Sequence, residues 1–305
     1  MKIVMRGGLG NQLFQFCFIH GYALKYTSLH IEIIPDPNPA FERDFNLDTV
    51  LKHCDHVRVG SLPEALPSKS LKFIWIRFRE RVLLRKFTNL VPVISKMELH
   101  EKSQFIFGCP KRRLTRINLP IYGYFQHWRF VELVWPSIKY EIGSTIAENM
   151  KKLENRLDLS QLTTVIHIRG GDFIPLNDYF GFLSSEYYID ALATSYEATS
   201  VRSRILVVTN DPLYAQEIVR NIGLENVEIL DSDKYSTWET LAIMSSAHVV
   251  ITSNSTFSWW GGYLCMKNGG ICITPDKWYK YSEKASALSL NHPSFKVVKG
   301  ARSTS

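Results

Sequence analysis

Short apolar segments alternate with longer helix-like segments along most of this chain, and this alternation constrains its fold more than any other feature. It is typical of α/β proteins, in which helices connect parallel strands and cover both faces of the sheet. Two helix starts are well marked, because Asn210-Asp211 precedes Pro212 and Ser236 is followed three residues later by Glu239. The strands that we expect are 2–5, 30–34, 119–124, 163–168, 204–209, 227–230, 247–252 and 271–274.

The length of 305 residues suits two domains better than one. A polar, helix-like stretch at 143–160 is the expected connection between them. We therefore expect an N-terminal α/β domain over 1–155 and a C-terminal α/β domain over 156–305. The segment 40–118 is rich in charge and carries few signals of strands or helices.

The chain shows no membrane span, because charged residues interrupt its apolar runs well before the roughly 18 residues that a span needs. The start, Met-Lys-Ile-Val-Met-Arg-Gly, is too short for a signal peptide. The five cysteines lack the paired spacing of a zinc site or a disulfide framework. We expect a cytoplasmic protein without an export signal.

The formal charge of +7 favours anionic partners such as nucleotides or an acidic membrane surface. Seven basic residues lie between Lys69 and Lys86, interleaved with aromatic and aliphatic residues. This segment is either an amphipathic helix that contacts an anionic membrane peripherally or an ordinary helix with a solvated basic face.

The apolar run 163–168 ends in Arg169, Gly170, Gly171 and Asp172. Open α/β sheets bind ligands at the carboxyl ends of their strands, and glycines allow a ligand close to the backbone. The guanidinium of Arg169 offers a planar set of donors that suits phosphate oxygens, so it is our leading anion-binding residue. The alternative is a strand end with a solvated Arg–Asp pair.

A second glycine-rich segment, Gly7-Gly-Leu-Gly-Asn-Gln12, separates the first strand from a helix expected over 13–25. Backbone amides at such a turn can hold phosphate, and Gly8 with Asn11 and Gln12 are candidates for contact with a sugar nucleotide. The segment does not match the dinucleotide fingerprint. Tight packing between strand and helix would also explain its glycines.

The third segment is Ser253-Asn-Ser-Thr-Phe-Ser-Trp-Trp-Gly-Gly262, after the strand 247–252. Asn254 or Ser255 should cap a helix that starts near Thr256, and amides and hydroxyls from Asn254 to Phe257 would form a second anion site. Each of the two glycines costs about 1 kcal/mol relative to alanine within a helix. Either close packing or ligand approach must compensate for that cost.

Other chemistries have weaker support. Asp231-Ser-Asp233 has the spacing of a manganese site, but no further ligand lies nearby in sequence, and a solvated acidic turn explains it. His167 alternates with apolar residues, so it is either a hydrogen-bonded strand histidine or a ligand contact. Nucleophile elbows, phosphate-binding Walker loops and zinc patterns are absent from the sequence.

In their order and spacing, the three segments resemble the α-1,2-fucosyltransferases of glycosyltransferase family 11. The family's Gly-Gly-Leu-Gly-Asn-Gln start is present at Gly7–Gln12, and its Ser-Asn-Ser-Thr-Phe-Ser-Trp-Trp segment is complete at Ser253–Trp260. Its His-x-Arg-Arg-Gly-Asp-Tyr segment is matched by His167, Arg169, Gly171, Asp172 and Phe173.

The resemblance implies a GT-B-like fold, with two Rossmann-like domains that face a central cleft. It implies inverting transfer of fucose from GDP-fucose, without a metal or other cofactor, to the 2-hydroxyl of a galactose-terminated oligosaccharide or lipid-linked bacterial surface glycan. The C-terminal half would bind the donor and the N-terminal half the acceptor. Nucleic acid is not an expected partner.

The resemblance also implies roles for single residues. Arg169 would stabilise the leaving GDP, and Asn11 and Gln12 would hold fucose or phosphate. Asp172 would be the catalytic base or would orient the loop, with Asp178 and Glu186 as weaker candidates for the base.

The chain departs from the family pattern at two positions. Gly170 stands where the family has a second arginine, and Thr240 stands where relatives often have an acid. Glu239 would then read guanine or only cap its helix. These departures leave open another donor or acceptor, or a binding module that has lost catalysis.

Overall fold

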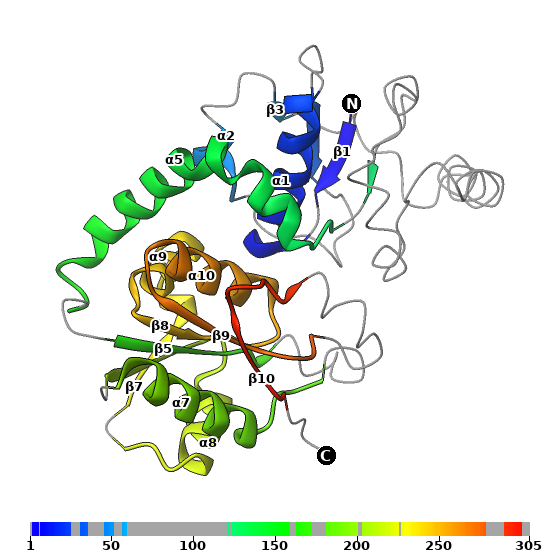
Figure 1. The fold of residues 1–305 in the computed structure, drawn as a ribbon. Coiled ribbons are helices and arrows are strands. Elements are labelled where there is room, and N and C mark those ends of the chain that lie inside the picture. The colour runs from blue at the N-terminus through cyan, green and yellow to red at the C-terminus, as the bar shows by residue number, and fades with distance from the viewer. Residues whose placement is uncertain are drawn as a thin grey trace, which may run out of the picture. The chain divides into compact units, whose positions relative to one another are not determined.

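The computed structural model of the protein describes residues 2–5, 7–25, 31–35, 46–51, 57–59, 121–122, 124–158, 163–171, 181–200, 203–225, 227–278 and 290–300. The chain forms two compact units, Met1–Phe125 and Gln126–Ser305, and each contains a parallel sheet with helices (Figure 1). The expected α/β class is thus confirmed. The division falls after Phe125, so the long helix that follows groups with the C-terminal unit, whereas the sequence analysis assigned 126–155 to the N-terminal domain.

The N-terminal unit has a four-stranded parallel sheet in the order β3-β2-β1-β4. Its elements are β1 (Lys2–Met5), α1 (Leu9–Lys25), β2 (Ile31–Pro35), α2 (Asp48–Leu51), β3 (Val57–Val59) and β4 (Ile121–Tyr122). Helix α1 carries the described core of this unit, since Leu13, Phe14, Phe16 and Cys17 are fully buried. It begins directly after the glycine turn and therefore fixes that turn against the sheet.

The C-terminal unit is built on a six-stranded parallel sheet in the order β10-β9-β8-β5-β6-β7. Its strands are β5 (Thr163–Ile168), β6 (Arg204–Thr209), β7 (Glu228–Asp231), β8 (Val249–Ile251), β9 (Ile271–Pro275) and β10 (Lys296–Val298). Every residue of β5 is buried, as expected for a central parallel strand. The carboxyl end of β5 lies between those of β6 and β8.

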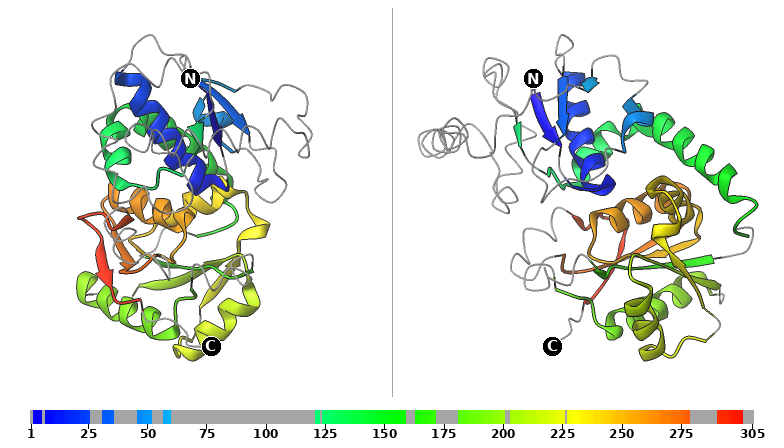
Figure 2. Two further views of the ribbon diagram at one scale, coloured as in Figure 1. Left: turned by 90° about the vertical axis from the view of Figure 1, so that its right-hand side faces the viewer. Right: turned by 180° about the vertical axis from the view of Figure 1, so that it is seen from behind.

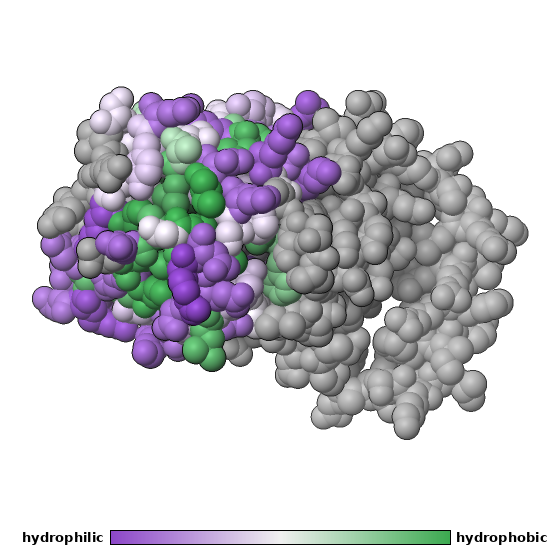
Figure 3. Space-filling model, turned by 90° about the horizontal axis from the view of Figure 1, so that it is seen from below, coloured by the Kyte–Doolittle hydropathy of each residue, from purple (hydrophilic) through white to green (hydrophobic). Residues whose placement is uncertain are grey.

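Helices cover both faces of this sheet (Figures 1 and 2). Helices α7 (Ser185–Thr199) and α8 (Pro212–Asn221) pack on one face. Helices α9 (Thr237–Ser246) and α10 (Thr256–Lys267) pack on the other, and α5 (Trp128–Leu153) lies against α9. Figure 3 shows apolar areas among polar ones on the face seen from below. Ile189 of α7 and Leu213 of α8 are exposed.

The predicted starts of α8, α9 and α10 are confirmed, whereas α1 begins at Leu9 and not at Leu13 as expected. Asp211 caps α8 with Pro212 in its first turn, Ser236 and Glu239 form a capping box on α9, and Ser255 is the N-cap residue of α10. The predicted helix at 143–160 is instead the second half of α5, which begins at Trp128 and ends at Leu153. Strands β3 and β10 and helix α7 were not predicted, because two are only three residues long and the third has a weak apolar pattern.

The paired glycines of α10 are explained by packing. A Cβ atom at Gly261 would overlap the side chain of Met244 on α9, and one at Gly262 would overlap Cys272 on β9. Both glycines therefore allow α10 to approach α9 and the sheet closely, which compensates for their low helix propensity.

Among the described residues, no helix is long and apolar enough to cross a membrane. The basic segment 69–86 lies outside the described residues, so its contact with a membrane stays a prediction.

Candidate active site

The carboxyl ends of β5 and β8 are joined by a hydrogen bond between two buried side chains. His167 Nδ1 lies 2.9 Å from Ser253 Oγ, and the imidazole ring also faces the ring of Phe257 at 5.8 Å between centroids. Burial and, secondly, the charge of Arg169 lower the pKa of His167 to about 3. His167 is thus a neutral, hydrogen-bonded strand histidine that links β5 to the segment Ser253–Gly262.

The turn after β8 is held by its own polar side chains. Ser258 Oγ accepts a hydrogen bond from the Ser253 backbone amide at 2.9 Å. Asn254 Nδ2 donates to the Gly181 carbonyl at 3.0 Å and to the Trp278 carbonyl at 3.4 Å. Asn254 therefore orders the surrounding loops with its amide nitrogen.

Helix α10 starts at Thr256, so its first backbone amides lie at the carboxyl edge of the sheet beside β5. Ser255 is buried, and its side chain makes no capping hydrogen bond with the helix. Thr256 and Phe257 are partly exposed. Because the first four amides of a helix lack intrahelical acceptors, this edge has the donors that an anion site needs.

The loop after Arg169 is fastened to the end of β6. The Gly170 amide donates to Asn210 Oδ1 at 3.1 Å, and Asn210 Nδ2 donates back to the Gly170 carbonyl at 3.3 Å. The Gly171 amide donates to Asp211 Oδ2 at 3.0 Å. The sequence analysis identified Asp211 only as a helix cap and missed this second contact, for which the pair of polar residues after a strand was the available signal.

The packing around Gly170 explains why this position differs from the family pattern. A Cβ atom at this position would lie 2.7 Å from Asp211 Cβ and 3.0 Å from Tyr214 Cδ1. A side chain as large as arginine does not fit there unless the start of α8 moves. The loop therefore presents Arg169 alone, without the second arginine.

The glycine turn of the N-terminal unit is closed by Gln12, a residue in the first turn of α1. Gly7 has a φ of +76°, and its carbonyl accepts a hydrogen bond from Gln12 Nε2 at 2.9 Å. Gln12 Oε1 accepts from the Asn46 amide at 3.0 Å, and the Gln12 side chain is buried. Gln12 therefore has a structural role at both ends of its amide, whereas Asn11 is partly exposed and Gly8 has open space around its Cα.

Glu239 has a structural role as well. Its Oε2 accepts from the Ser236 amide at 2.7 Å, and its Oε1 pairs with Arg156 Nη1 at 2.9 Å. The hydrogen bond from Ser236 holds the pKa of this carboxyl below its ordinary value. The capping interpretation is thus confirmed, and contact with guanine stays a prediction.

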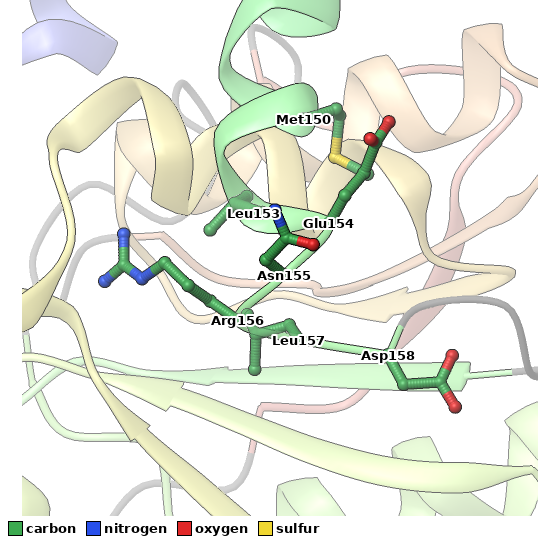
Figure 4. Close-up of a pocket in the computed structure, with 7 residues that line it drawn as sticks. All are labelled: Met150, Leu153, Glu154, Asn155, Arg156, Leu157 and Asp158. Atoms are coloured by element: carbon green, nitrogen blue, oxygen red, sulfur yellow. The ribbon is translucent and has the colours of Figure 1, made fainter.

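Arg156 also borders a hollow of about 660 Å³ at the end of α5 (Figure 4). Its guanidinium lies over the Tyr235 ring at 4.5 Å and donates to the Lys234 carbonyl. None of the predicted site residues lines this hollow. Its lining residue Arg156 is connected to Glu239 by their ion pair.

The remaining candidates divide into three groups. Asp231 caps a short 3-10 turn through its bond from the Asp233 amide at 3.1 Å, and the described residues contain no cluster of three potential metal ligands. Glu186 is exposed in the first turn of α7. Asp172 and Asp178 lie outside the described residues, so the identity of the base stays a prediction.

Sequence comparison identifies relatives over nearly the whole chain. An alpha-1,2-colitosyltransferase from Escherichia coli is 26% identical, with 92% of each chain covered. The O-antigen biosynthesis glycosyltransferase WbnK from the same species is 25% identical, covering 93% of this chain and 97% of the relative. A galactoside 2-alpha-L-fucosyltransferase from Caenorhabditis elegans is also 25% identical, covering 89% and 70%.

Among solved structures, a glycosyltransferase of family 9 from Veillonella parvula aligns with a TM-score of 0.48 at 11% identity, covering 100% of this chain and 88% of that one. Residues 1–291 match the sequence model of a protein family, glycosyl transferase family 11. The chain therefore belongs to glycosyltransferase family 11.

Proposed function

We propose that the protein transfers L-fucose from GDP-fucose to the 2-hydroxyl of a terminal β-galactoside in a bacterial surface glycan precursor, with inversion and without a metal. The observation that carries the proposal is the position of Arg169 at the carboxyl end of β5, next to the β8–α10 turn, in a chain of this family. The names of the relatives support a fucose-like donor and O-antigen synthesis.

The donor half of the reaction requires a group that stabilises the departing GDP. Negative charge builds on the β-phosphate as the bond to the sugar breaks, and the sugar becomes positively charged in the transition state. The guanidinium of Arg169 can meet two phosphate oxygens at once. The amides at the start of α10 would add donors without adding a full charge.

The acceptor half requires a group that takes the proton of the attacking hydroxyl. Asp172 follows Gly171 directly and is our candidate for this base. In the N-terminal unit, Asn11 and Gly8 are better candidates for sugar contact than Gln12, whose amide is engaged by Gly7 and Asn46. The acceptor would be an oligosaccharide or a lipid-linked glycan that ends in galactose.

A second donor has specific support, since one relative is named for colitose. Colitose differs from fucose only in lacking the 3-hydroxyl, so the same phosphate contacts would serve both donors. A binding module without catalysis is the alternative from another class, suggested by Gly170 and Thr240.

The proposal also includes a cytoplasmic location. The cysteines among the described residues, Cys17, Cys265 and Cys272, are unpaired and buried, which fits a reducing compartment.

The test measures GDP release and product formation with GDP-fucose, with and without a panel of β- and α-galactosides. We expect acceptor-dependent release and an α-1,2-linked product, at a rate that EDTA leaves unchanged. Tight GDP binding without turnover on any galactoside would support the binding module instead. Turnover with GDP-colitose alone would reassign the donor, and loss of activity with EDTA would refute the metal-free mechanism.

A further inference from the structure

Two glycines directly follow Arg169, and glycine is the residue that loses most conformational freedom when it is ordered. Gly171 has a φ of +55°, a conformation that other residues rarely adopt. If this backbone were free to move, the residue before it would be presented in many orientations. An arginine that binds phosphate with paired donors needs one orientation.

Asn210 restricts this backbone through both atoms of its amide. Its Oδ1 accepts from the Gly170 amide and its Nδ2 donates to the Gly170 carbonyl, at 3.1 and 3.3 Å. The two residues are 40 positions apart in the sequence and follow neighbouring parallel strands, β5 and β6. The Asn210 side chain thus links the two chains beyond the last pair of the strands, Ile168 and Thr209.

Asp211 restricts the next residue and connects it to α8. Its Oδ2 accepts from the Gly171 amide at 3.0 Å, while its Oδ1 accepts from the Tyr214 amide at 3.1 Å in the first turn of the helix. Its own backbone amide donates to Thr209 Oγ1 at 3.0 Å, and Thr209 is fully buried. Asp211 is therefore held at its backbone amide by Thr209 and at its carboxylate by the helix, and the same carboxylate holds the loop.

We propose that Asn210 and Asp211 are positioning residues that act through Arg169 by fixing the backbone of Gly170 and Gly171. This inference rests on the proposed function, in which Arg169 binds the diphosphate of the donor. It goes further by assigning the order of the anion site to two side chains of the connection between β6 and α8, which need not touch the ligand.

The charge of Asp211 makes the test sharp. Asp211→Ser retains a good N-cap for α8 but cannot also reach the Gly171 amide. It removes a negative charge from the neighbourhood of an anion site, so electrostatics alone would tighten binding of an anion. Loss of positioning would weaken it, and the two explanations therefore predict opposite signs.

The experiment measures the affinity for GDP and for inorganic pyrophosphate by calorimetry, in wild type, Asn210→Ala and Asp211→Ser, and again in an Arg169→Ala background. We expect each substitution to weaken binding about 5- to 20-fold in wild type and less than 2-fold once Arg169 is absent, because residues that act as a unit are not additive. Asn268→Ala is the matched control. It removes one side-chain hydrogen bond, to the Ser245 carbonyl, at the opposite edge of the sheet, and should keep wild-type affinity.

Thermal unfolding of each variant shows that it folds, and Asp211→Ser remains available should Asn210→Ala unfold. Wild-type affinity in both variants, with weakened binding in Arg169→Ala, would overturn the positioning role and leave the proposed function intact. Equal losses with and without Arg169 would also overturn it. If the wild type bound neither GDP nor pyrophosphate, the proposed function and this inference would both be refuted.

Discussion

Two glycine turns of the described chain, one in each unit, are held by different means. In the N-terminal unit, Gly7 is held by Gln12, only five positions away. In the C-terminal unit, Gly170 and Gly171 are held by Asn210 and Asp211, 40 positions away. The first turn can form as soon as α1 forms, whereas the second exists only after β5 and β6 have paired.

The two ways of holding a turn differ in how firmly they fix the backbone. When a turn is closed by a residue five positions away, little chain entropy is lost, because only a short loop is closed. A turn closed from a neighbouring strand is tied to the whole sheet and moves only with it. The residue that we assign to phosphate, Arg169, precedes the second kind of turn. Substitutions in the two turns should therefore have different consequences for activity and stability.

The largest expected effect is on activity in the second turn. Arg169→Lys should lower kcat/KM for GDP-fucose about 100- to 1,000-fold, because an ammonium cannot reproduce paired contacts with phosphate. Arg204→Lys is the matched control, since Arg204 lies at the opposite end of the neighbouring strand, paired with Glu228. It should keep near-wild-type turnover. Equal activity in the two variants would remove Arg169 from the mechanism.

The next effect is on stability in the same turn. Gly170→Ala should lower the free energy of unfolding toward the upper end of about 1–3 kcal/mol, because its Cβ meets the inflexible Cβ of Asp211. Gly143→Ala is the control, since nothing lies within 4 Å of a Cβ at this helical position. That change should raise stability by about 0.5–1 kcal/mol. Denaturant unfolding measures both, and an unaffected Gly170→Ala would show that the loop has slack.

Much of the C-terminal sheet could be predicted from the sequence, because fully apolar runs such as Ile205–Val208 have few alternatives to a buried strand. The caps at Asp211 and Ser236 could also be predicted, because helix capping depends on residues only three positions apart in the sequence. The contacts from Asn210 and Asp211 to the loop were not readable. They depend on which strands become neighbours, and spacing along the chain does not carry that information.

Polar residues in the three segments show the same limit. Gln12, Asn254 and Glu239 were predicted to contact substrate, and the structure engages each of them in hydrogen bonds within the protein. A side-chain amide or carboxylate beside a turn can hydrogen-bond to the turn or to a ligand equally well. Sequence alone cannot separate these uses, because both require the same residue type at the same edge of the sheet.

A third prediction concerns pH and tests the strand that leads into the second turn. The unfolded chain protonates His167 near pH 6.5, whereas the folded protein resists protonation down to about pH 3. Its contribution to stability is therefore complete above pH 6.5 and is lost as the pH falls toward 3. Between pH 7 and 5 this loss amounts to about 2 kcal/mol. His167→Gln should lose about 2 kcal/mol less over the same range, measured by urea unfolding at each pH. An identical acid dependence of the two proteins would show that folding does not lower the pKa of His167.

The smallest expected effect on stability is in the first turn. It tests whether Gly8 allows a ligand to approach the backbone or only allows close packing. A Cβ at Gly8 would meet no atom within 4 Å, so Gly8→Ala should change the free energy of unfolding by less than about 0.5 kcal/mol. Gly7→Ala is the contrasting variant, because its φ of +76° and the side chain of Asn11 oppose any Cβ. If substrate approaches the backbone at Gly8, the stable Gly8→Ala variant should still lose several-fold in kcat/KM. Full activity would leave this turn a structural element and place all ligand contact of the glycine turns in the loop after Arg169.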